Sequence, residues 1–560
     1  MINVYTFPYK SSSLAVLLVC LGFSQQTQAQ TRPDAGQTLQ QVLPQRLELP
    51  ATSSMPIELR PPPNAANIMP GGAVVQLVEV RFTGNTVFDS AVLEEVLGPY
   101  KGKSFDLAGL NVLANQVSSF YRAFGYPFAS VFVPAQRVVD GVVQMDVVEG
   151  RYGQVQALSD EPQWAEQAEV FLRDLEPGQV IESSVLERAT LILDDLPGVR
   201  VNPIIRPGQK AQTADLDITL LRDPAVTGDV GLDNYGNRYT GEIRSRANIN
   251  INSPFMLGDQ IKVSALYTQE KLWFANVGYS LPVGGSGFTA QVGYAQTSYQ
   301  LGREFASLQS YGTAKVSSVG LSYPVVRSQE ANLSLSTVYQ HKLLNDNTDS
   351  TITRNHKSSN SLPVNLQFDV RDGWGGGGLS YGVMSWTLGQ LDLDANLLSA
   401  DTGQTRGSFQ KLNFDLARVQ NLWAPLSLYG RFAGQRANKN LDSSEGFSLG
   451  GANGVRAYPT GEASGDEGWL VQLELRYSAG FYSPYVFHDA GYLKVDARSN
   501  GLANSSPDQR RAGAGFGVRY NAGPWRLDGS LAWRTRGGPP QADTSSDPNP
   551  RVWLSLGYLI

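Results

Sequence analysis

The second half of the chain is built of short segments in which apolar and polar residues alternate strictly. Within residues 242–252 one face carries isoleucine, alanine and serine, and the other carries arginine, asparagine and glutamate. Residues 469–477 repeat the pattern, with glutamine, glutamate and arginine on the polar face. A period of two is typical of β-strands whose faces meet different surroundings. Because so much charge is costly in a packed core, the pattern favours a membrane barrel with a polar lumen.

Sixteen such segments follow one another, and a closed antiparallel barrel with both ends on one side requires an even number. We therefore expect a transmembrane β-barrel over residues 225–560. A large soluble β-protein, such as a propeller or an adhesin, is the alternative. The expected strands are residues 226–235, 239–252, 258–268, 271–282, 287–299, 312–324, 331–343, 361–371, 377–390, 406–418, 423–436, 469–479, 484–495, 510–521, 524–534 and 551–560.

The connections between these segments largely alternate between long and short. Outer-membrane barrels have short periplasmic turns and long outer loops, so this alternation supports the barrel. The short connections include 283–286 and 522–523, and the long polar ones are 300–311, 344–360, 391–405, 437–468, 496–509 and 535–550. Beyond residue 29 no apolar stretch reaches the roughly 20 residues that a membrane-spanning helix needs.

Charge and motifs argue against nucleic-acid binding and against catalysis. The formal net charge is -6, whereas nucleic-acid binding needs a basic excess. The histidines, His341, His356 and His488, are too scattered for a zinc site of the H-E-x-x-H type. No phosphate-binding loop of the G-x-x-x-x-G-K-[ST] type is present, and the glycine run 375–378 falls at an expected turn. We expect no enzyme activity, no metal and no cofactor.

The amino terminus predicts export and a mobile segment. Lys10 precedes an apolar run at residues 14–23, and the following polar stretch ends at Ala29 like a signal-peptidase site. We expect residues 1–29 to be a cleaved signal peptide, because the run is too short to span a membrane. Residues 30–73 form a proline-rich linker. Its residues 37–49 are predicted to form an amphipathic helix shortened or kinked at Pro44; a disordered leader is the alternative.

Residues 74–151 and 152–224 predict two small α+β modules with the order strand, helix, helix, strand, strand. In the first, residues 106–124 have helical periodicity and two strands follow at 129–139 and 142–148. In the second, the pattern predicts a strand at 153–158, a helix at 164–175 and strands at 199–205 and 216–221. Ser184 and Glu187 fit a capping box for the second helix of that module.

Several motifs resemble those of two-partner secretion transporters (TpsB; ShlB/FhaC/HecB-like), within the BamA insertase superfamily. The long connection contains V-R-A-Y at 455–458 and G-E-A-S-G-D-E-G at 461–468, with Ala457 where the family usually has glycine. A later strand reads F-H-D-A-G at 487–491. The first module has G-Y-P at 125–127 and V-V-E-G at 147–150, and the second has L-P-G at 196–198.

The resemblance implies a fold and a set of site residues. The fold is a 16-stranded outer-membrane barrel preceded by two POTRA (polypeptide-transport-associated) modules and a plug helix, with loop 437–468 folded into the barrel. The lock between loop and barrel comprises Val455, Arg456, Tyr458, Phe487, Asp489 and Gly491. The loop motif comprises Gly461, Glu462, Gly465, Asp466 and Gly468. Recognition of cargo by the modules is expected at Gly125, Tyr126, Pro134, Glu149, Gly150, Pro197 and Gly198.

A bidentate pair between Arg456 and Asp489 is the central expectation, because alternation places Asp489 on the lumenal face and the resemblance brings Arg456 to it. The pair is expected either to take part in transport or only to stabilise the barrel. In both cases the loss of one partner leaves an uncompensated charge.

The implied function is export of a large unfolded exoprotein of the adhesin or hemolysin type from the periplasm of a Gram-negative bacterium. The partners are that exoprotein, which carries an N-terminal secretion domain, outer-membrane lipids and the barrel assembly machinery; we expect a monomer with no nucleic acid. A barrel-protein insertase and a passive porin or small-molecule receptor are the alternatives. The first usually has five modules, and the others lack the modules or carry a large plug domain.

Overall fold

The computed structural model describes residues 32–43, 47, 49–50, 69–498, 508–543 and 546–560. The expected signal peptide at residues 1–29 lies outside the described residues, as does most of the proline-rich linker.

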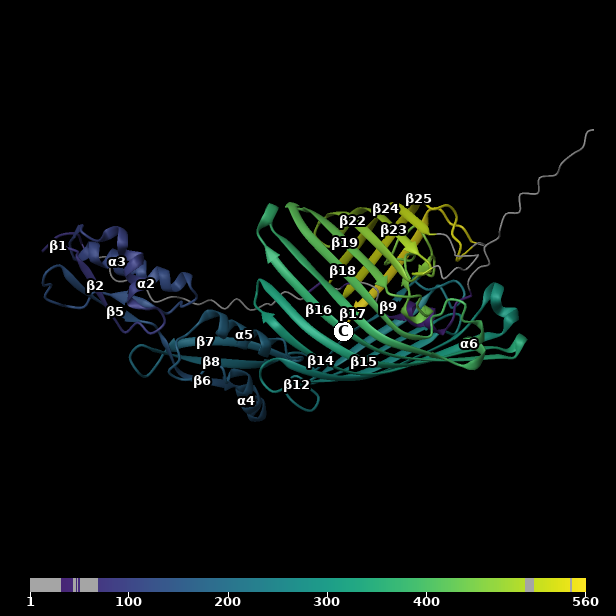
Figure 1. Ribbon diagram of the computed structural model, residues 1–560, viewed down its shortest axis with the longest axis horizontal. Coiled ribbons are helices and arrows are strands. Elements are labelled where there is room, and N and C mark those ends of the chain that lie inside the picture. Colours follow the sequence, from purple (N-terminus) through teal and green to yellow (C-terminus); the bar gives the residue numbers. More distant parts are fainter. Residues whose placement is uncertain (1–31, 44–46, 48, 51–68, 499–507, 544–545) are drawn as a thin grey trace, which may run out of the picture. The chain divides into compact units, whose positions relative to one another are not determined.

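Sixteen strands of the described residues form a closed antiparallel barrel, which confirms the predicted fold class (Figure 1). Each pairs with its neighbours along the chain, and the last strand closes the barrel on the first. The strands are β9 (Val226–Asp233), β10 (Arg244–Asn252), β11 (Gln260–Thr268), β12 (Trp273–Val283), β13 (Phe288–Gln300), β14 (Ser310–Arg327), β15 (Ala331–Thr348), β16 (Thr353–Asp372), β17 (Gly378–Leu393), β18 (Gly407–Trp423), β19 (Leu426–Ala437), β22 (Glu467–Tyr477), β23 (Tyr482–Lys494), β24 (Gln509–Ala522), β25 (Trp525–Arg536) and β26 (Arg551–Leu559).

The predicted long loop at residues 344–360 is wrong. β15 and β16 continue through most of it, and a short 3₁₀ turn, η4 (Asp349–Thr351), joins them. The prediction relied on alternation, which disappears where both faces of a hairpin meet water, although the backbone ladder continues. The other outer connections hold only short elements, η3 (Arg303–Leu308) and α6 (Ala395–Ala400) among them.

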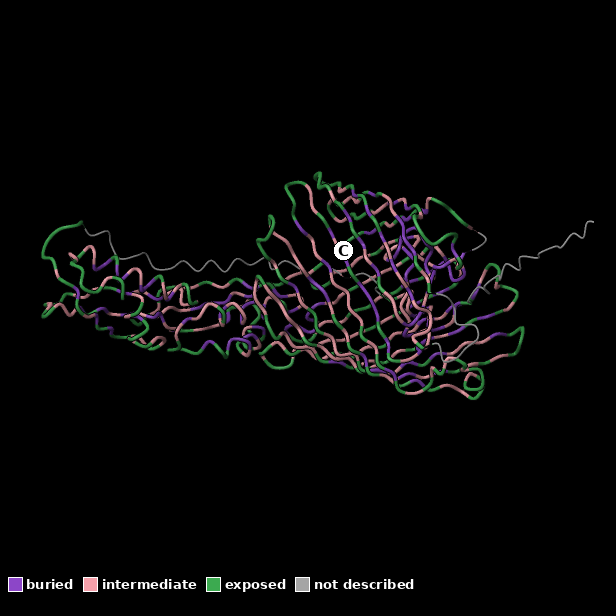
Figure 2. The backbone as a smooth tube through the Cα atoms, turned by 45° about the horizontal axis from the view of Figure 1, so that its top comes forward, coloured by how far each residue is buried: buried purple, intermediate pink, exposed green. Residues whose placement is uncertain are grey.

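Alternation along the strands separates an outer face from a lumenal face. On β22 the lumenal Gln472 is 6% exposed, whereas its outward neighbour Leu473 is 45% exposed. Buried stretches gather where residues 438–466, the inward loop, lie inside the barrel (Figure 2). This loop contains η6 (Ser443–Glu445) and the short strands β20 (Phe447–Ser448) and β21 (Ser464–Gly465), which pair with each other.

The first module packs helices α2 (Ser90–Leu97) and α3 (Leu107–Ala123) on a three-stranded sheet. The sheet order is β2 (Glu79–Thr83), β5 (Val142–Val148), β4 (Ser130–Phe132), and a separate pair joins β1 (Val75–Gln76) to β3 (Ser104–Phe105). The predicted strand 129–139 is too long, since β4 ends at Phe132. Beyond it the Gln136 side chain takes over the pairing, accepting from the Gln144 amide and donating to its carbonyl, both at 2.7 Å.

The second module has the sheet order β6 (Arg151–Leu158), β8 (Thr213–Arg222), β7 (Val199–Pro207). Its helices are α4 (Pro162–Glu169), followed by the turn η2 (Val170–Leu172), and α5 (Ser183–Asp194). The predicted capping box is wrong, because α5 begins at Ser183 and the Ser184 hydroxyl donates to Glu182, its N-cap residue. Within the described parts of the chain, no helix is both long and apolar enough to cross a membrane.

Helix α1 (Ala35–Val42) lies against the lumenal side of β13, β14 and β15 and against η6. The sequence places the start at residue 37, whereas the helix begins at Ala35 with Asp34 as its N-cap. It ends at Val42, and Leu43 has an extended backbone. A residue before proline disfavours the helical conformation, so Pro44 explains why the helix is shorter than the predicted 37–49.

Candidate functional site: the inward loop and helix α1

The guanidinium of Arg456 forms a bidentate pair with Asp489 inside the barrel. Its Nε donates to Asp489 Oδ2 at 2.8 Å and its Nη2 to Oδ1 at 2.6 Å. The Arg456 backbone amide also donates to Oδ2 at 3.1 Å. The Asp489 residue is 0% exposed, so the carboxylate depends wholly on these donors. The pair joins the tip of the inward loop to β23.

Sequence reasoning missed two further partners of Arg456. Its Nη1 donates to Glu474 Oε1 at 2.7 Å, and its carbonyl accepts from the Trp553 indole at 2.7 Å. Glu474 also forms ion pairs with Arg476 and Arg519, so its carboxylate pairs with three guanidinium groups. Alternation shows that Glu474 faces the lumen, but the register that sets Glu474 opposite Phe487 is not readable from the sequence.

The remaining predicted lock residues surround this pair. The Phe487 ring lies under the guanidinium, with 3.5 Å between its centroid and Arg456 Cζ. Val455 and Tyr458 are fully buried in the same cluster. Tyr458 Oη donates to the carbonyls of Arg536 and Gly538 at 2.7 and 3.0 Å. Gly491 is a close approach: a Cβ there would lie 2.6 Å from Leu449 Cδ2 of the loop.

The second half of the loop motif forms a separate anchor. Glu462 accepts from Arg511 Nε and Nη2 at 3.0 and 2.9 Å, and from the amides of Gln541 and Ala542 at 2.8 Å each. Gly461 supplies a φ of +91°, which favours glycine. The loop is therefore fastened to β24 and to the last outer connection as well as to β22 and β23.

Asp466, Gly465 and Gly468 close the base of the loop. Asp466 accepts from the amides of Leu441 and Ala497 at 3.1 and 2.9 Å. Burial, with Asp496 and Glu467 adding to it, raises the pKa of Asp466 to about 6 despite these two hydrogen bonds. At Gly465 and Gly468 a Cβ would approach the Lys494 and Tyr492 carbonyl oxygens to 2.6 and 2.7 Å.

Ala457 replaces the usual glycine without backbone strain. The described residues with positive φ include Ala463 but not Ala457. The Ala457 methyl group instead faces Gly513 of β24, where a Cβ would lie 2.4 Å from it. Because the Ala457 methyl group occupies this space, residue 513 of β24 must be glycine to avoid a clash.

Helix α1 is held by charged contacts at its N-terminus. Asp34 caps the helix by accepting from the Gln37 amide at 2.9 Å. Its carboxylate also accepts hydrogen bonds from Lys357 Nζ at 3.1 Å and from the Ser443 hydroxyl at 2.8 and 2.6 Å. Asp346 of β15 accepts from the Ala35 amide at 2.8 Å. Nothing in the sequence analysis singled out these residues, which lie hundreds of positions apart along the chain.

Glu445 of η6 is held between two lysines of the barrel wall. Lys342 and Lys411 Nζ approach its oxygens Oε1 and Oε2 to 2.6 and 2.8 Å. Burial opposes ionisation, but the two ammonium groups outweigh it and lower the pKa of Glu445 to about 2. The preceding Ser444 carbonyl accepts a hydrogen bond from Gln40 of α1. The turn η6 thus connects the wall to the helix.

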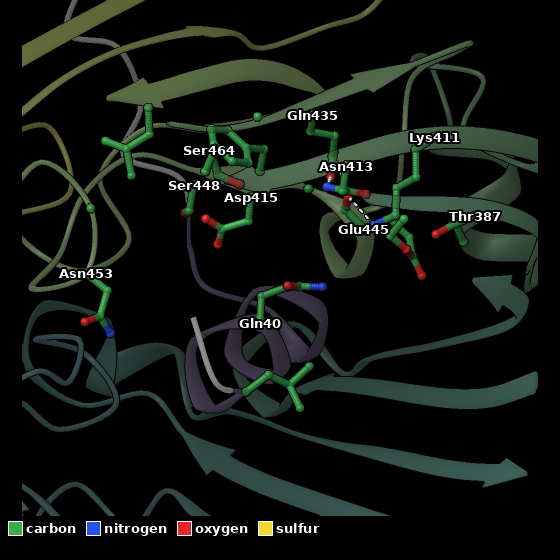
Figure 3. A pocket seen from close by; sticks show the side chains of 18 of the residues that line it. Gln40, Thr387, Lys411, Asn413, Asp415, Gln435, Glu445, Ser448, Asn453 and Ser464 are labelled. Carbon is green, nitrogen blue, oxygen red and sulfur yellow. Dashed lines mark hydrogen bonds and ion pairs between the residues drawn. The ribbon is translucent and has the colours of Figure 1, made fainter. Parts of the chain in front are cut away.

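A cavity of about 500 Å³ lies between α1, the inward loop and strands β15 to β19 (Figure 3). Glutamine and asparagine side chains from all three sides line it, and Lys342, Lys411 and Glu445 lie at its wall. In Figure 3, Gln40 points from the helix toward this space, with Asn413, Gln435 and Lys411 above it. Among the described residues, no group of three or more histidine, cysteine or acidic side chains is placed to hold a metal.

The predicted module residues lie in turns and joints, and Glu149 and Gly150 are buried whereas the other five are partly exposed. Glu149 is 3% exposed and accepts from the amides of Thr86 and Val87 at 2.6 and 2.7 Å. The Gly125 carbonyl accepts from the Ser183 amide and hydroxyl at 2.9 and 3.0 Å, which ties the first module to α5 of the second. Such contacts account for these residues without cargo.

The other predicted module residues also make contacts within turns or at joints. Tyr126 packs edge-on against Phe88, 5.8 Å between ring centroids, and the Gly150 carbonyl accepts from the Ile181 amide at 2.9 Å. The Pro197 carbonyl accepts from the Ser253 hydroxyl at 2.6 Å, at the joint with the barrel. Gly198 has a φ of +81°. Pro134 lies in the segment after β4, where Gln136 pairs with Gln144.

Two family models match the chain. The model described as haemolysin secretion/activation protein ShlB/FhaC/HecB matches residues 212–520, and the POTRA domain of the ShlB type matches residues 75–150. The chain belongs to the haemolysin secretion/activation protein family. The resemblance predicted from the loop, strand and module motifs is confirmed by these matches.

The similar proteins include transporters, one of them named for the outer membrane. The heme/hemopexin transporter protein HuxB of Haemophilus influenzae strain Rd is 27% identical, over 97% of this chain and 98% of its own. The outer membrane transporter CdiB of Dickeya dadantii is 25% identical over 73% of each chain. The present protein is an outer-membrane transporter of this kind, with its POTRA domain in the periplasm.

Solved structures show the same fold. CdiB from Escherichia coli superimposes with a TM-score of 0.73 at 20% identity, covering 91% of this chain and 94% of that one. BamA from Haemophilus ducreyi lacking POTRA domains 1–3 gives a TM-score of 0.51 at 15% identity, covering 87% and 100%. These similarities show that the chain shares the fold of the two solved structures.

Proposed function

We propose that this protein translocates a large unfolded exoprotein from the periplasm to the cell surface, with no catalytic step. The observation that carries the proposal is that α1 and the inward loop occupy a polar lumen and are held there by noncovalent contacts, both polar and apolar. Asp34, Glu445 and Arg456 make the main polar ones. Such contacts can be exchanged for contacts with a passing chain. Because no bond is broken, the residues of the site need only bind and release.

The modules offer edges on which an extended chain can add as a further strand. In the second module β6 and β7 are the edge strands, and in the first β2 and β4 are. β7 contains Pro203 and Pro207, which lack the backbone donor that pairing requires. We therefore assign cargo docking to the remaining edge strands, β2, β4 and β6, through main-chain hydrogen bonds that tolerate many sequences. Cargo recognition at the seven motif residues stays a separate prediction.

The domain boundaries follow from the same proposal. Residues 74–151 and 152–224 act as two POTRA modules that bind the exoprotein. Residues 30–73 contain the plug helix α1 and the linker that connects it to the first module. The apolar outer face of the barrel contacts outer-membrane lipids. The closed strand order leaves no unpaired strand edge in the membrane, so a monomer is sufficient. Insertion of the barrel requires the barrel assembly machinery.

Secretion of a partner exoprotein tests the proposal. The transporter is co-expressed with a candidate exoprotein of the adhesin or hemolysin type, and the exoprotein is measured in the medium. Export is expected with the wild type and is expected to fall sharply when residues 74–222 are deleted, although the barrel still inserts. Retention of the exoprotein by cells that carry the wild type would refute the transport assignment for that partner.

A further inference from the structure

The cavity beside α1 has the composition of a peptide site. Its volume of about 500 Å³ lies within the roughly 300–1,000 Å³ of ordinary ligand pockets. Gln37 and Gln40 line it from the helix, and Gln340, Asn413 and Gln435 line it from the wall. Amide side chains both donate and accept hydrogen bonds, as a peptide backbone does. The cavity therefore suits an extended polypeptide segment without dictating most of its sequence.

One end of the cavity has a charge preference. Lys342 and Lys411 are contributed by rigid wall strands, β15 and β18, whereas the carboxylate between them belongs to η6 of the inward loop. Removing Glu445 alone leaves two ammonium groups uncompensated in a largely buried place. Replacing it by another carboxylate keeps both ion pairs. Displacement of Glu445 therefore costs little free energy only if an incoming acidic group takes its place between the two lysines.

Movement of Glu445 acts directly on the plug helix. The same short turn supplies Ser443, whose hydroxyl donates to Asp34, and Ser444, whose carbonyl accepts from Gln40. Gly36 of α1 lies so close that a Cβ there would be 2.4 Å from Ser443 Oγ. A shift of η6 therefore breaks contacts at both ends of the helix.

We propose that this cavity binds an acidic segment of an extended polypeptide, whose carboxylate replaces Glu445 between Lys342 and Lys411 and so releases η6 from α1. The inference rests on the proposed function, because the exported chain is the source of the segment. It assigns a ligand chemistry to the plugged state, namely carboxylate side chains on an unfolded chain. Cargo thus triggers its own passage.

Binding is tested with the purified full-length transporter and fluorescent peptides of equal length that alternate serine with glutamate, glutamine or lysine. Anisotropy is expected to show binding of the glutamate peptide at least about tenfold tighter than of the glutamine peptide, because charge-assisted hydrogen bonds are the stronger ones. The double variant Lys342→Met/Lys411→Met should lose this preference. Lys262→Met is the matched control, since Lys262 pairs with the lumenal Asn250 on β10 and β11, outside the cavity lining.

Glu445→Gln separates competition from a merely structural role. If Glu445 competes with the peptide, this variant binds the glutamate peptide more tightly than the wild type, whereas a structural role predicts unchanged or weaker binding. Unchanged binding in Glu445→Gln, or equal affinity of the wild type for the glutamate and glutamine peptides, overturns the proposal. A folded barrel is verified for each variant by its heat-dependent shift in gel mobility.

Release of the helix is measured separately by maleimide labelling of Thr38→Cys, with Cys20 replaced by serine. Thr38 is 0% exposed on α1, so labelling reports departure of the helix. The glutamate peptide should accelerate labelling and the glutamine peptide should not; equal rates overturn the coupling. Secretion of the exoprotein by the wild type together with a negative peptide result contradicts this inference alone. Peptide binding without any secretion contradicts the proposed function.

Discussion

At the residue scale, Arg456 is the most heavily used group of the site. Its guanidinium donates to Asp489 and Glu474, and its carbonyl accepts from the Trp553 indole, so it joins the loop to β22, β23 and β26 at once. Both carboxylates are almost fully buried. A buried charge that loses its partner is worse for stability than a pair that was never present.

Arg456→Ala is therefore expected to destabilise the loop by about 3–5 kcal/mol, because it leaves Asp489 and Glu474 facing each other. The temperature at which the barrel loses its compact gel mobility measures the effect. The double variant Arg456→Met/Asp489→Leu should recover part of the loss. If Arg456→Ala melts like the wild type, the pair does not hold the loop.

Ala457 and Gly513 make a second prediction at this scale. Gly513→Ala places a methyl group 2.4 Å from the Ala457 methyl group and is expected to cost about 1–3 kcal/mol through overpacking. Adding Ala457→Gly should restore most of the stability, since it removes the shortest contact and leaves the Trp533 carbonyl oxygen 3.1 Å from the added Cβ. The same melting assay compares the single and the double variants. If Gly513→Ala and the double variant are destabilised equally, the contact with residue 457 is not the cause of the destabilisation.

At the scale of elements, the inward loop is fastened at its base by Asp466. The raised pKa of about 6 means that the folded loop binds a proton more tightly than an unfolded aspartate, whose pKa is about 3.9. This contribution to stability is complete below about pH 4 and is lost as the pH rises through about 6, at most about 3 kcal/mol. The base of the loop should thus be held more firmly at low pH.

We expect hydrogen exchange of residues 438–466 to be slower at pH 5 than at pH 8, after correction for intrinsic rates. Asp466→Asn, which does not titrate, should remove most of this difference while retaining one acceptor oxygen for either the Leu441 or the Ala497 amide, which bind different oxygens of Asp466. Persistence of the full difference in Asp466→Asn would place its origin at another group.

At the N-terminus of helix α1, Asp34 makes both the capping hydrogen bond and the ion pair with Lys357. Asp34→Ser keeps a side chain that can cap the helix but removes the charge that pairs with Lys357. Asp34→Ala removes both. Channel openings in planar bilayers are expected to become more frequent with Asp34→Ser and more frequent still with Asp34→Ala. Asp349→Ser on the exposed turn η4 is the control, and a closed channel in both Asp34 variants would show that the ion pair does not retain the helix.

At the scale of the whole molecule, the modules must be connected to the barrel in a defined way for cargo to reach the lumen. The joint is built from Pro197 and Gly198 of the second module with Ser253 and Asn252 of the barrel. Gly198 has positive φ, and a Cβ on it would lie 2.9 Å from Asn252 Cβ. Both features exclude a larger residue without local rearrangement.

Gly198→Ala is expected to reduce exoprotein secretion severalfold, because strain at positive φ costs roughly 1 kcal/mol or more. Barrel folding, followed by gel mobility, should stay intact because the strands are untouched. Gly178→Ala, at a positive-φ turn with no atom near the added Cβ, is the control for backbone strain alone. Normal secretion by Gly198→Ala would remove the joint from the transport route.

The sequence alone determined which residues form barrel strands and which faces line the lumen. That information is local, because a period of two is written into each segment wherever lipid lies on one side and water on the other. Strand prediction from this alternation was wrong at residues 344–360, where both faces of the hairpin meet water. It was also wrong after β4, where the Gln136 side chain substitutes for strand pairing. Only the tertiary structure decided that Glu474 and Trp553 meet Arg456, and that Asp34, Lys342, Lys357 and Lys411 fasten the plug and the loop. Those contacts depend on strand register and on the path of the loop through the lumen, and no local pattern of residues encodes either.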